Sequence, residues 1–413
     1  MSISAALPYS AAPAPSTPLG PFADTALTWT TWVALMGFVG LAALALVAAG
    51  PAARRIGPDT YAAVTARLAA AAAALGLLAV PAALTDNAHA ASESGGYDYG
   101  SAWNSLYDGS TPGLLWGLDI TLCLVGAALV APLASRRFAA GPARAWLLGG
   151  GLAAGAVALI TTKFPDKKPD NWGRTVFGTL MWVLHLLGGA VWIGGLIGLL
   201  LLALSSRIRP EDRAVFWSPA IRRFSVTAMS CVAAITLSGL FLYWGHVDGP
   251  SQLVTTMYGR VLGVKILIFG AMLLLGVFNQ FWLHPRIDAL RAAGDQRPLR
   301  TILFRTFPVV VGVEVALALA LLFVAPFLHG SARNQAFQAD AAKHATTASV
   351  KDLPKLPAKQ AHASTWILGT AETAAVIALM VAGYRVSGRL ARRRTALVAA
   401  PSAPADPDAL VQA

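Results

Sequence analysis

Nine apolar runs, each long enough to cross a lipid bilayer as a helix, constrain this chain more than any other feature. A bilayer core requires about 20 apolar residues in helical form. Backbone amides in lipid must form hydrogen bonds within their own segment, and no short alternating strands are present, so the runs are expected to be helices. The sequence therefore predicts an all-α polytopic membrane protein, with spans at about 27–50, 64–85, 113–133, 143–162, 176–204, 220–246, 258–282, 302–328 and 364–385.

Composition agrees with this class of protein. Hydrophobic residues make up 56% of the 413 residues, and only 13% are charged. Soluble domains carry about a quarter charged residues, so an ordinary cytosolic enzyme is excluded. The expected location is the plasma (inner) membrane, and the expected environment is the lipid bilayer.

The basic residues predict the direction of insertion. When charges at the edge of a run are counted with the adjacent loop, the segments after the odd-numbered runs carry 21 Lys and Arg. The segments on the other side carry 9, and two more lie inside the seventh run. By the positive-inside rule, the N-terminus is expected outside and the C-terminus inside the cell. The formal net charge of +12 then reflects topology, so no nucleic-acid partner is expected.

The spacing of the runs suggests how the chain is divided. The long basic segment after the fourth run separates two sets of four spans, and a polar segment precedes the last span. The expected parts are a disordered outer N-terminus (1–26), a four-helix bundle (27–162), a second four-helix domain (163–330), an outer loop (331–363), a ninth helix (364–385) and a cytoplasmic tail (386–413).

Four charged residues fall well inside the apolar runs, where a charge is costly and usually functional. Asp119, Lys265 and Glu372 each lie about seven residues into runs that cross in the same direction. They are expected to share a depth of roughly 10 Å, so Lys265 is expected to pair with Asp119 or Glu372. The pair would either fix helix register or belong to a substrate or proton pathway. Glu314 has no evident partner in the sequence and is expected to be protonated.

Histidine and methionine residues suggest a soft-metal path. Met181 and His185 are four residues apart and share a helical face. A thioether beside an imidazole suits copper, and Cu(I) in particular. His246 and His329 lie at the outer ends of the sixth and eighth runs, on the side toward which His185 also lies. Because His185 is deeper than the other two, a relay of sites is expected and not one shared coordination sphere.

Small residues on the fifth run predict close helix packing. Ala190, Gly194 and Gly198 recur every four residues, a spacing that lets a neighbouring transmembrane helix approach closely.

Three ordered motifs carry a family resemblance. The fifth run contains His185-x6-Trp192-x-Gly194-Gly195, the sixth contains Arg223-Phe224-Ser225 followed by Thr236-Leu-Ser238-Gly239-Leu240, and the seventh contains Tyr258-Gly259-Arg260-Val-Leu262-Gly-Val-Lys265. Over about residues 176–330 the chain resembles the copper resistance D (CopD) family. The resemblance implies an inner-membrane protein that moves copper inward, often beside a small periplasmic carrier (CopC). The residues that match the family motifs, and to which the resemblance assigns a functional role, are His185, Trp192, Gly194, Gly195, Arg260 and Lys265.

The sequence therefore predicts a copper permease and not an enzyme. Motifs of the HExxH, GxSxG and GxxxxGK[ST] types are absent. Two alternatives stay open. The chain could be a non-transporting assembly or docking partner of a copper enzyme, or a haem b redox protein in which His185 and His246 hold the haem.

Overall fold

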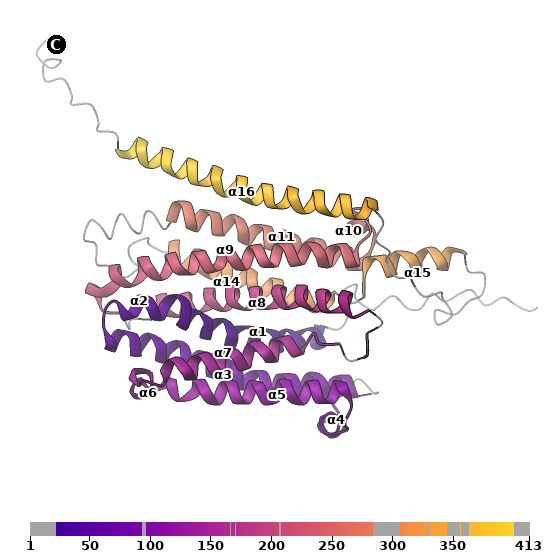
Figure 1. Cartoon of the computed structure of the whole chain (residues 1–413), viewed down its shortest axis with the longest axis horizontal. Coiled ribbons are helices and arrows are strands. Elements are labelled where there is room, and N and C mark those ends of the chain that lie inside the picture. Colours follow the sequence, from indigo (N-terminus) through magenta and orange to yellow (C-terminus); the bar gives the residue numbers. More distant parts are fainter. Residues whose placement is uncertain are drawn as a thin grey trace, which may run out of the picture.

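The structure is a computed structural model that describes residues 22–399, apart from 93–95, 166, 170, 206–207, 284–305, 329, 345–355 and 357–362. Within these residues the chain is helical and contains no strand. Nine helical segments among the described residues are long and apolar enough to cross a membrane, which confirms the predicted fold class and the number of spans. The long helices lie side by side (Figure 1) and are α1 (Phe22–Leu44), α3 (Pro58–Ala91), α5 (Thr111–Val130), α7 (Arg144–Thr161), α8 (Trp172–Ala203), α9 (Arg213–His246), α11 (Met257–Phe278), α14 (Thr306–Val324) and α16 (Ala363–Ala399).

Short elements connect or extend the long helices. Figure 1 shows α4, α10 and α15 at one end of the long helices, and α2 and α6 at the other end. The predicted outer loop 331–363 thus contains a helix, α15, whereas the N-terminal residues 1–21 lie outside the described part of the chain. The short elements are η1 (Ala45–Ala49), α2 (Gly50–Arg54), α4 (Tyr99–Ser105), η2 (Ala131–Ala134), α6 (Arg136–Ala140), η3 (Pro210–Asp212), α10 (Gln252–Thr255), η4 (Asn279–Leu283), η5 (Ala325–Phe327) and α15 (Ala332–His344).

Polar residues immediately before the apolar runs define where several helices begin. Ser110, Asn171 and Thr256 each accept a hydrogen bond from the backbone N–H three residues later, at the starts of α5, α8 and α11. Such N-caps satisfy backbone donors that have no partner inside the helix. In the first span, Pro51 has no N–H to donate, and the chain widens into the π-helical turn η1 just before it.

The buried core is continuous across the whole bundle. Phe38 of α1 is fully buried. Its ring occupies the space beside three glycines, where a side chain would crowd it: Gly76 of α3, Gly126 of α5 and Gly155 of α7. One hydrophobic cluster includes residues of α1, α3, α5, α7, α8, α9, α11 and α14. Helix α1 contacts both α3 and α8, so it joins the two sets of four spans.

Helices α1 and α8 approach each other closely at the predicted row of small residues. A Cβ atom built on Gly194 would lie 2.6 Å from the Cα atom of Gly40. The next small residue, Gly198, faces the side chains of Leu41 and Leu44. The neighbouring helix that this row accommodates is therefore α1.

The last helix lies along the outside of the bundle. Helix α16 neighbours α9 and η4, and the rings of Tyr384 and Phe281 are in edge-to-face contact at 5.4 Å. It is drawn in yellow beside α11 and α9 in Figure 1. The helix continues to Ala399, past the predicted end of the span at 385. Arg, Ala and Leu dominate this extension, and all three are strong helix formers.

Candidate functional site

A cavity of about 300 Å³ opens among the helices of the second set and α1. Its lining comes from α1, α8, α9, α11, α14 and the segment after α7. Four residues that the sequence predicted as site residues line it, namely His185, Trp192, His246 and Lys265. The fold thus brings together residues from three helices that are up to 80 positions apart in the chain.

His185 of α8 is held in one tautomer. Its Nδ1 lies 3.1 Å from the Oγ of Ser238 on α9, and this hydroxyl donates its own hydrogen to the carbonyl of Ala234 at 2.6 Å. Because the serine hydrogen is used there, Ser238 accepts from His185, and Nδ1 carries the imidazole hydrogen. Nε2 is left with its lone pair. A neutral imidazole oriented in this way is the form that ligates metals.

His246, at the end of α9, has the same arrangement. Its Nδ1 lies 2.7 Å from the carbonyl oxygen of Leu242, which can only accept, so Nδ1 again carries the hydrogen. The ring stacks on Tyr258 with a centroid distance of 5.8 Å and an interplanar angle of 6°. Nε2 is the nitrogen that this hydrogen bond does not use. Two such imidazoles therefore line one cavity.

The two histidines lie at different levels of the cavity. Ser238 is at the level of His185 because they share a hydrogen bond, and His246 follows eight residues later on the same helix. Eight helical residues correspond to about 12 Å along the axis. The backbone positions therefore suit two successive sites, as the sequence predicted for a relay.

The thioethers that line the cavity are not the predicted one. Met36 of α1 and Met272 of α11 both line it and are almost completely buried. Met181 does not line it, although it shares a helical face with His185. The lining positions of α8 run from Trp182 to Ile193, and at 100° per residue Met181 points roughly 85° away from the centre of this face. The methionines at the cavity therefore come from α1 and α11, and not from the position on α8 that the spacing suggested.

Aromatic rings and cations complete the lining. Trp192 packs edge to face on Phe269 at 5.9 Å. The Nζ of Lys163, in the segment after α7, lies 4.9 Å from the ring centroid of Trp182 and 5.6 Å from that of Trp32. Burial lowers the pKa of Lys163 below its usual value. Sequence analysis did not select Lys163, Trp32, Met36 or Met272, because nothing local distinguishes them from other loop and core residues.

The predicted ion pair of Lys265 is not found. In the part of the chain that the structure describes, Lys265 makes no ion pair with Asp119 or Glu372. Asp119 is on α5, which packs against α3 and α7, and its carboxylate is 4.0 Å from the Sγ of Cys123. Glu372 is exposed on α16. Equal depth in the membrane did not imply proximity, since α5 and α11 lie on opposite sides of the bundle (Figure 1).

The remaining predicted residues have other surroundings. Glu314 is buried and accepts a hydrogen bond of 2.9 Å from the Nδ2 of Asn279, a partner that the sequence did not suggest. Arg260 is exposed, and its Nε donates to the carbonyl of Val254. Gly194 and Gly195 pack against Gly40 and Phe224 and do not line the cavity.

Helix α15 packs against α10 and α11 beside the end of α9 that carries His246. The side chain of Gln335 accepts a hydrogen bond from the backbone N–H of Tyr258 at 2.9 Å, and Arg333 pairs with Asp248 at 2.8 Å. Ala332 is buried against Tyr258. The predicted ligand His329 lies immediately before this helix but outside the described residues.

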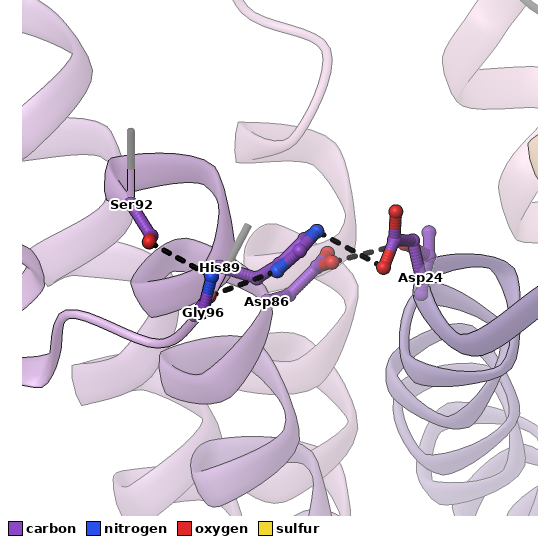
Figure 2. Close-up of polar contacts among 6 residues, drawn as sticks. Asp24, Asp86, His89, Ser92 and Gly96 are labelled. Carbon is purple, nitrogen blue, oxygen red and sulfur yellow. Dashed lines mark hydrogen bonds and ion pairs between the residues drawn. The ribbon is translucent and has the colours of Figure 1, made fainter. Parts of the chain in front are cut away.

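A second polar cluster joins α1 to α3 away from the cavity (Figure 2). The Nε2 of His89 lies 2.9 Å from Asp24, and its Nδ1 lies 3.1 Å from the carbonyl oxygen of Gly96. Asp86 accepts a hydrogen bond from Thr28. Because both nitrogens of His89 face acceptors, the ring can satisfy both only as a donor at each, with no lone pair left for a metal. This cluster therefore connects helices and is not a metal site.

The donor set of the cavity points to a soft metal. No group of three or more His, Cys, Asp or Glu residues is placed to hold a metal ion anywhere in the described ranges. The cavity instead offers two imidazoles, from His185 and His246, and two thioethers, from Met36 and Met272. Hard cations prefer carboxylate and carbonyl oxygen, whereas imidazole with thioether suits copper.

The fold and this cavity define a polytopic helical membrane protein with a nitrogen- and sulfur-lined site within its spans. Residues 218–328 match the family model described as "CopD: Copper resistance protein D". This segment of the chain is therefore similar to the CopD family, in agreement with the resemblance seen in the motifs. The match begins within α9, so it includes His246 and Lys265 but not the His185 motif on α8.

Two relatives agree with this assignment. The chain is 30% identical to the Copper transport protein CutJ of Bacillus subtilis (strain 168) over 182 residues, which are 44% of this chain and 31% of that protein. It is 28% identical to the Copper resistance protein D of Pseudomonas syringae pv. tomato over 144 residues, 34% of this chain and 46% of that protein. The matches thus span less than half of either relative. No solved structure shows significant similarity to the chain.

Proposed function

We propose that this protein is a copper permease of the inner membrane, and that the cavity lined by His185 and His246 is its copper path. One observation carries the proposal: the imidazoles of His185 and His246 line the same cavity, and each engages its Nδ1 in a hydrogen bond. The copper-related names of the family and of both relatives support it. In this proposal the chain transfers the ion and performs no covalent chemistry.

The route follows from the two levels of the cavity. Copper enters at the end beside α10 and α15, meets His246 first and then passes to His185, with Met36 and Met272 as further soft donors. The excess of basic residues on the opposite side supports an entrance that faces the outside of the cell. A periplasmic carrier of the CopC type would deliver the ion there.

The driving force is the membrane potential. The sequence has no ATP-binding motif of the GxxxxGK[ST] type. A potential that is negative inside favours cation entry by about 2.3 kcal/mol per charge per 100 mV. Cu(I) is favoured over Cu(II) because the available donors are soft and few.

Copper accumulation in cells tests the function. Cells that express the protein should accumulate more copper than cells without it, at equal extracellular copper. If the protein is present in the membrane and copper does not rise, the permease proposal is wrong. Co-purification with a copper enzyme would then favour the docking role, and a Soret absorption band would favour haem binding.

A His246→Ala variant is expected to slow copper accumulation about tenfold. Removal of the outer imidazole takes away the first nitrogen donor but leaves the deeper site of His185. Even the loss of a residue that only supports a metal ligand typically costs 10- to 100-fold in affinity or activity. Met181→Leu is the matched control, since Met181 lies outside the cavity lining. If His246→Ala accumulated copper at the same rate as the wild type, His246 would not be part of the copper path.

A further inference from the structure

The described residues that line the cavity include two lysines and no carboxylate. Lys163 reaches it from the segment after α7, and Lys265 reaches it from α11. Among the residues that the structure describes, neither lysine forms an ion pair or a hydrogen bond with an acidic side chain. The described cavity lining contains no Asp or Glu.

Such an arrangement favours the binding of a negative counter-charge. An ammonium group inside a low-dielectric region is costly unless it is paired, and two like charges in one cavity add mutual repulsion. The faces of Trp182 and Trp32 offset part of the cost for Lys163 by cation–π contact. No ring contact of this kind is found for Lys265 within the described residues.

The same lysines oppose the entry of a metal cation. Copper that reaches His185 shares the cavity with both ammonium groups, and nothing in the described lining has a compensating negative charge. An anion bound beside the lysines would neutralise them and make the cavity acceptable to a cation. Its natural donors are the two Nζ groups, and Tyr258 lines the cavity as a third possible donor.

We propose that a small inorganic anion, chloride or a similar halide, binds in the cavity between Lys163 and Lys265. The site depends on the cavity and its charges and not on the copper assignment. If the proposed function also holds, chloride strengthens copper binding and copper strengthens chloride binding, because coupling between two ligands is reciprocal.

The test uses the full chain, purified in detergent without copper. Chloride replaces gluconate at constant ionic strength, and the midpoint of thermal unfolding is followed. The midpoint of the wild type is expected to rise and then saturate with chloride, since a ligand that binds only the folded state stabilises it. Lys265→Met should weaken the apparent chloride affinity at least tenfold, and Lys163→Gln should weaken it by a similar factor.

A control variant and a stability measurement in gluconate complete the test. Lys167→Gln is the matched control, because Lys167 is exposed on the same segment as Lys163 and does not line the cavity; it should retain the chloride response. In gluconate, Lys265→Met should be at least as stable as the wild type, because it removes an unpaired buried charge. A destabilised Lys265→Met would mean that an acidic residue already neutralises Lys265, and the proposal would be wrong.

The experiment distinguishes an incorrect anion-site proposal from an incorrect copper-permease proposal. A wild type without a saturable chloride response, or a response that persists in Lys265→Met, would overturn the anion site even if copper still binds. Conversely, a chloride response that depends on Lys265 supports the anion site even in a protein that proves not to carry copper.

Discussion

A His185→Ala variant is expected to bind Cu(I) at least 100-fold more weakly than the wild type and to lose copper accumulation in cells. His185 supplies the deeper of the two imidazoles that line the cavity, and the described residues there offer no Asp, Glu or Cys to replace it. Each factor of ten in affinity corresponds to about 1.4 kcal/mol. The measurement is competition for Cu(I) between the purified protein and a chromophoric chelator.

A Ser238→Ala variant tests whether the orientation of the His185 ring matters for copper binding, because it leaves the imidazole itself in place. Ser238 does not line the cavity, but it accepts the Nδ1 hydrogen of His185 and so leaves Nε2 for the metal. We expect Cu(I) binding to fall 10- to 100-fold, the usual cost of losing a group that orients a ligand. Met181→Leu should leave the affinity unchanged. If Met181→Leu weakened binding as much as His185→Ala, the cavity would not be the copper site.

The fold could be predicted from the sequence because its cause is local. Each span requires about 20 apolar residues in succession, and that condition can be checked run by run. Even the run with Pro81 forms one continuous helix, α3.

The site could be predicted only in part, because it depends on which helices are neighbours. His185, Trp192, His246 and Lys265 carry motif or chemical signals and do line the cavity. Lys163 is one of four basic residues in a loop, and its place in the cavity depends on the packing of α7 beside α8.

The predicted ion pair of Lys265 was wrong because the sequence does not show which helices are neighbours. The pairing of Lys265 with Asp119 assumed that equal depth brings side chains together, but α5 packs on the far side of the bundle from α11. The prediction of Met181 assumed that the cavity face of α8 is centred on His185. The lining residues of α8 centre this face closer to Trp182 and Ile193, so Met181 lies outside it.

A Gly194→Leu variant is expected to lose most of the properly folded protein. At this position α8 and α1 meet backbone to backbone, and a Cβ atom on Gly194 would lie 2.6 Å from the Cα of Gly40. Backbone cannot move aside as a side chain can, so the two helices must separate. Overpacking of this kind costs about 3 kcal/mol or more, a large part of the about 5–15 kcal/mol that stabilises a typical folded protein. Size-exclusion chromatography after heating measures the loss.

Gly178→Leu provides the matched control on the same helix. Nothing lies within 4 Å of a Cβ atom at Gly178, so leucine should be tolerated there with little change in heat resistance. If both variants were equally stable, the contact between α1 and α8 would not be essential to the fold. Because α1 also contributes Trp32 and Met36 to the cavity, any Gly194→Leu protein that survives should bind copper and chloride more weakly. The close helix contact is therefore also a condition for the site, since separation of α1 from α8 opens the cavity between them.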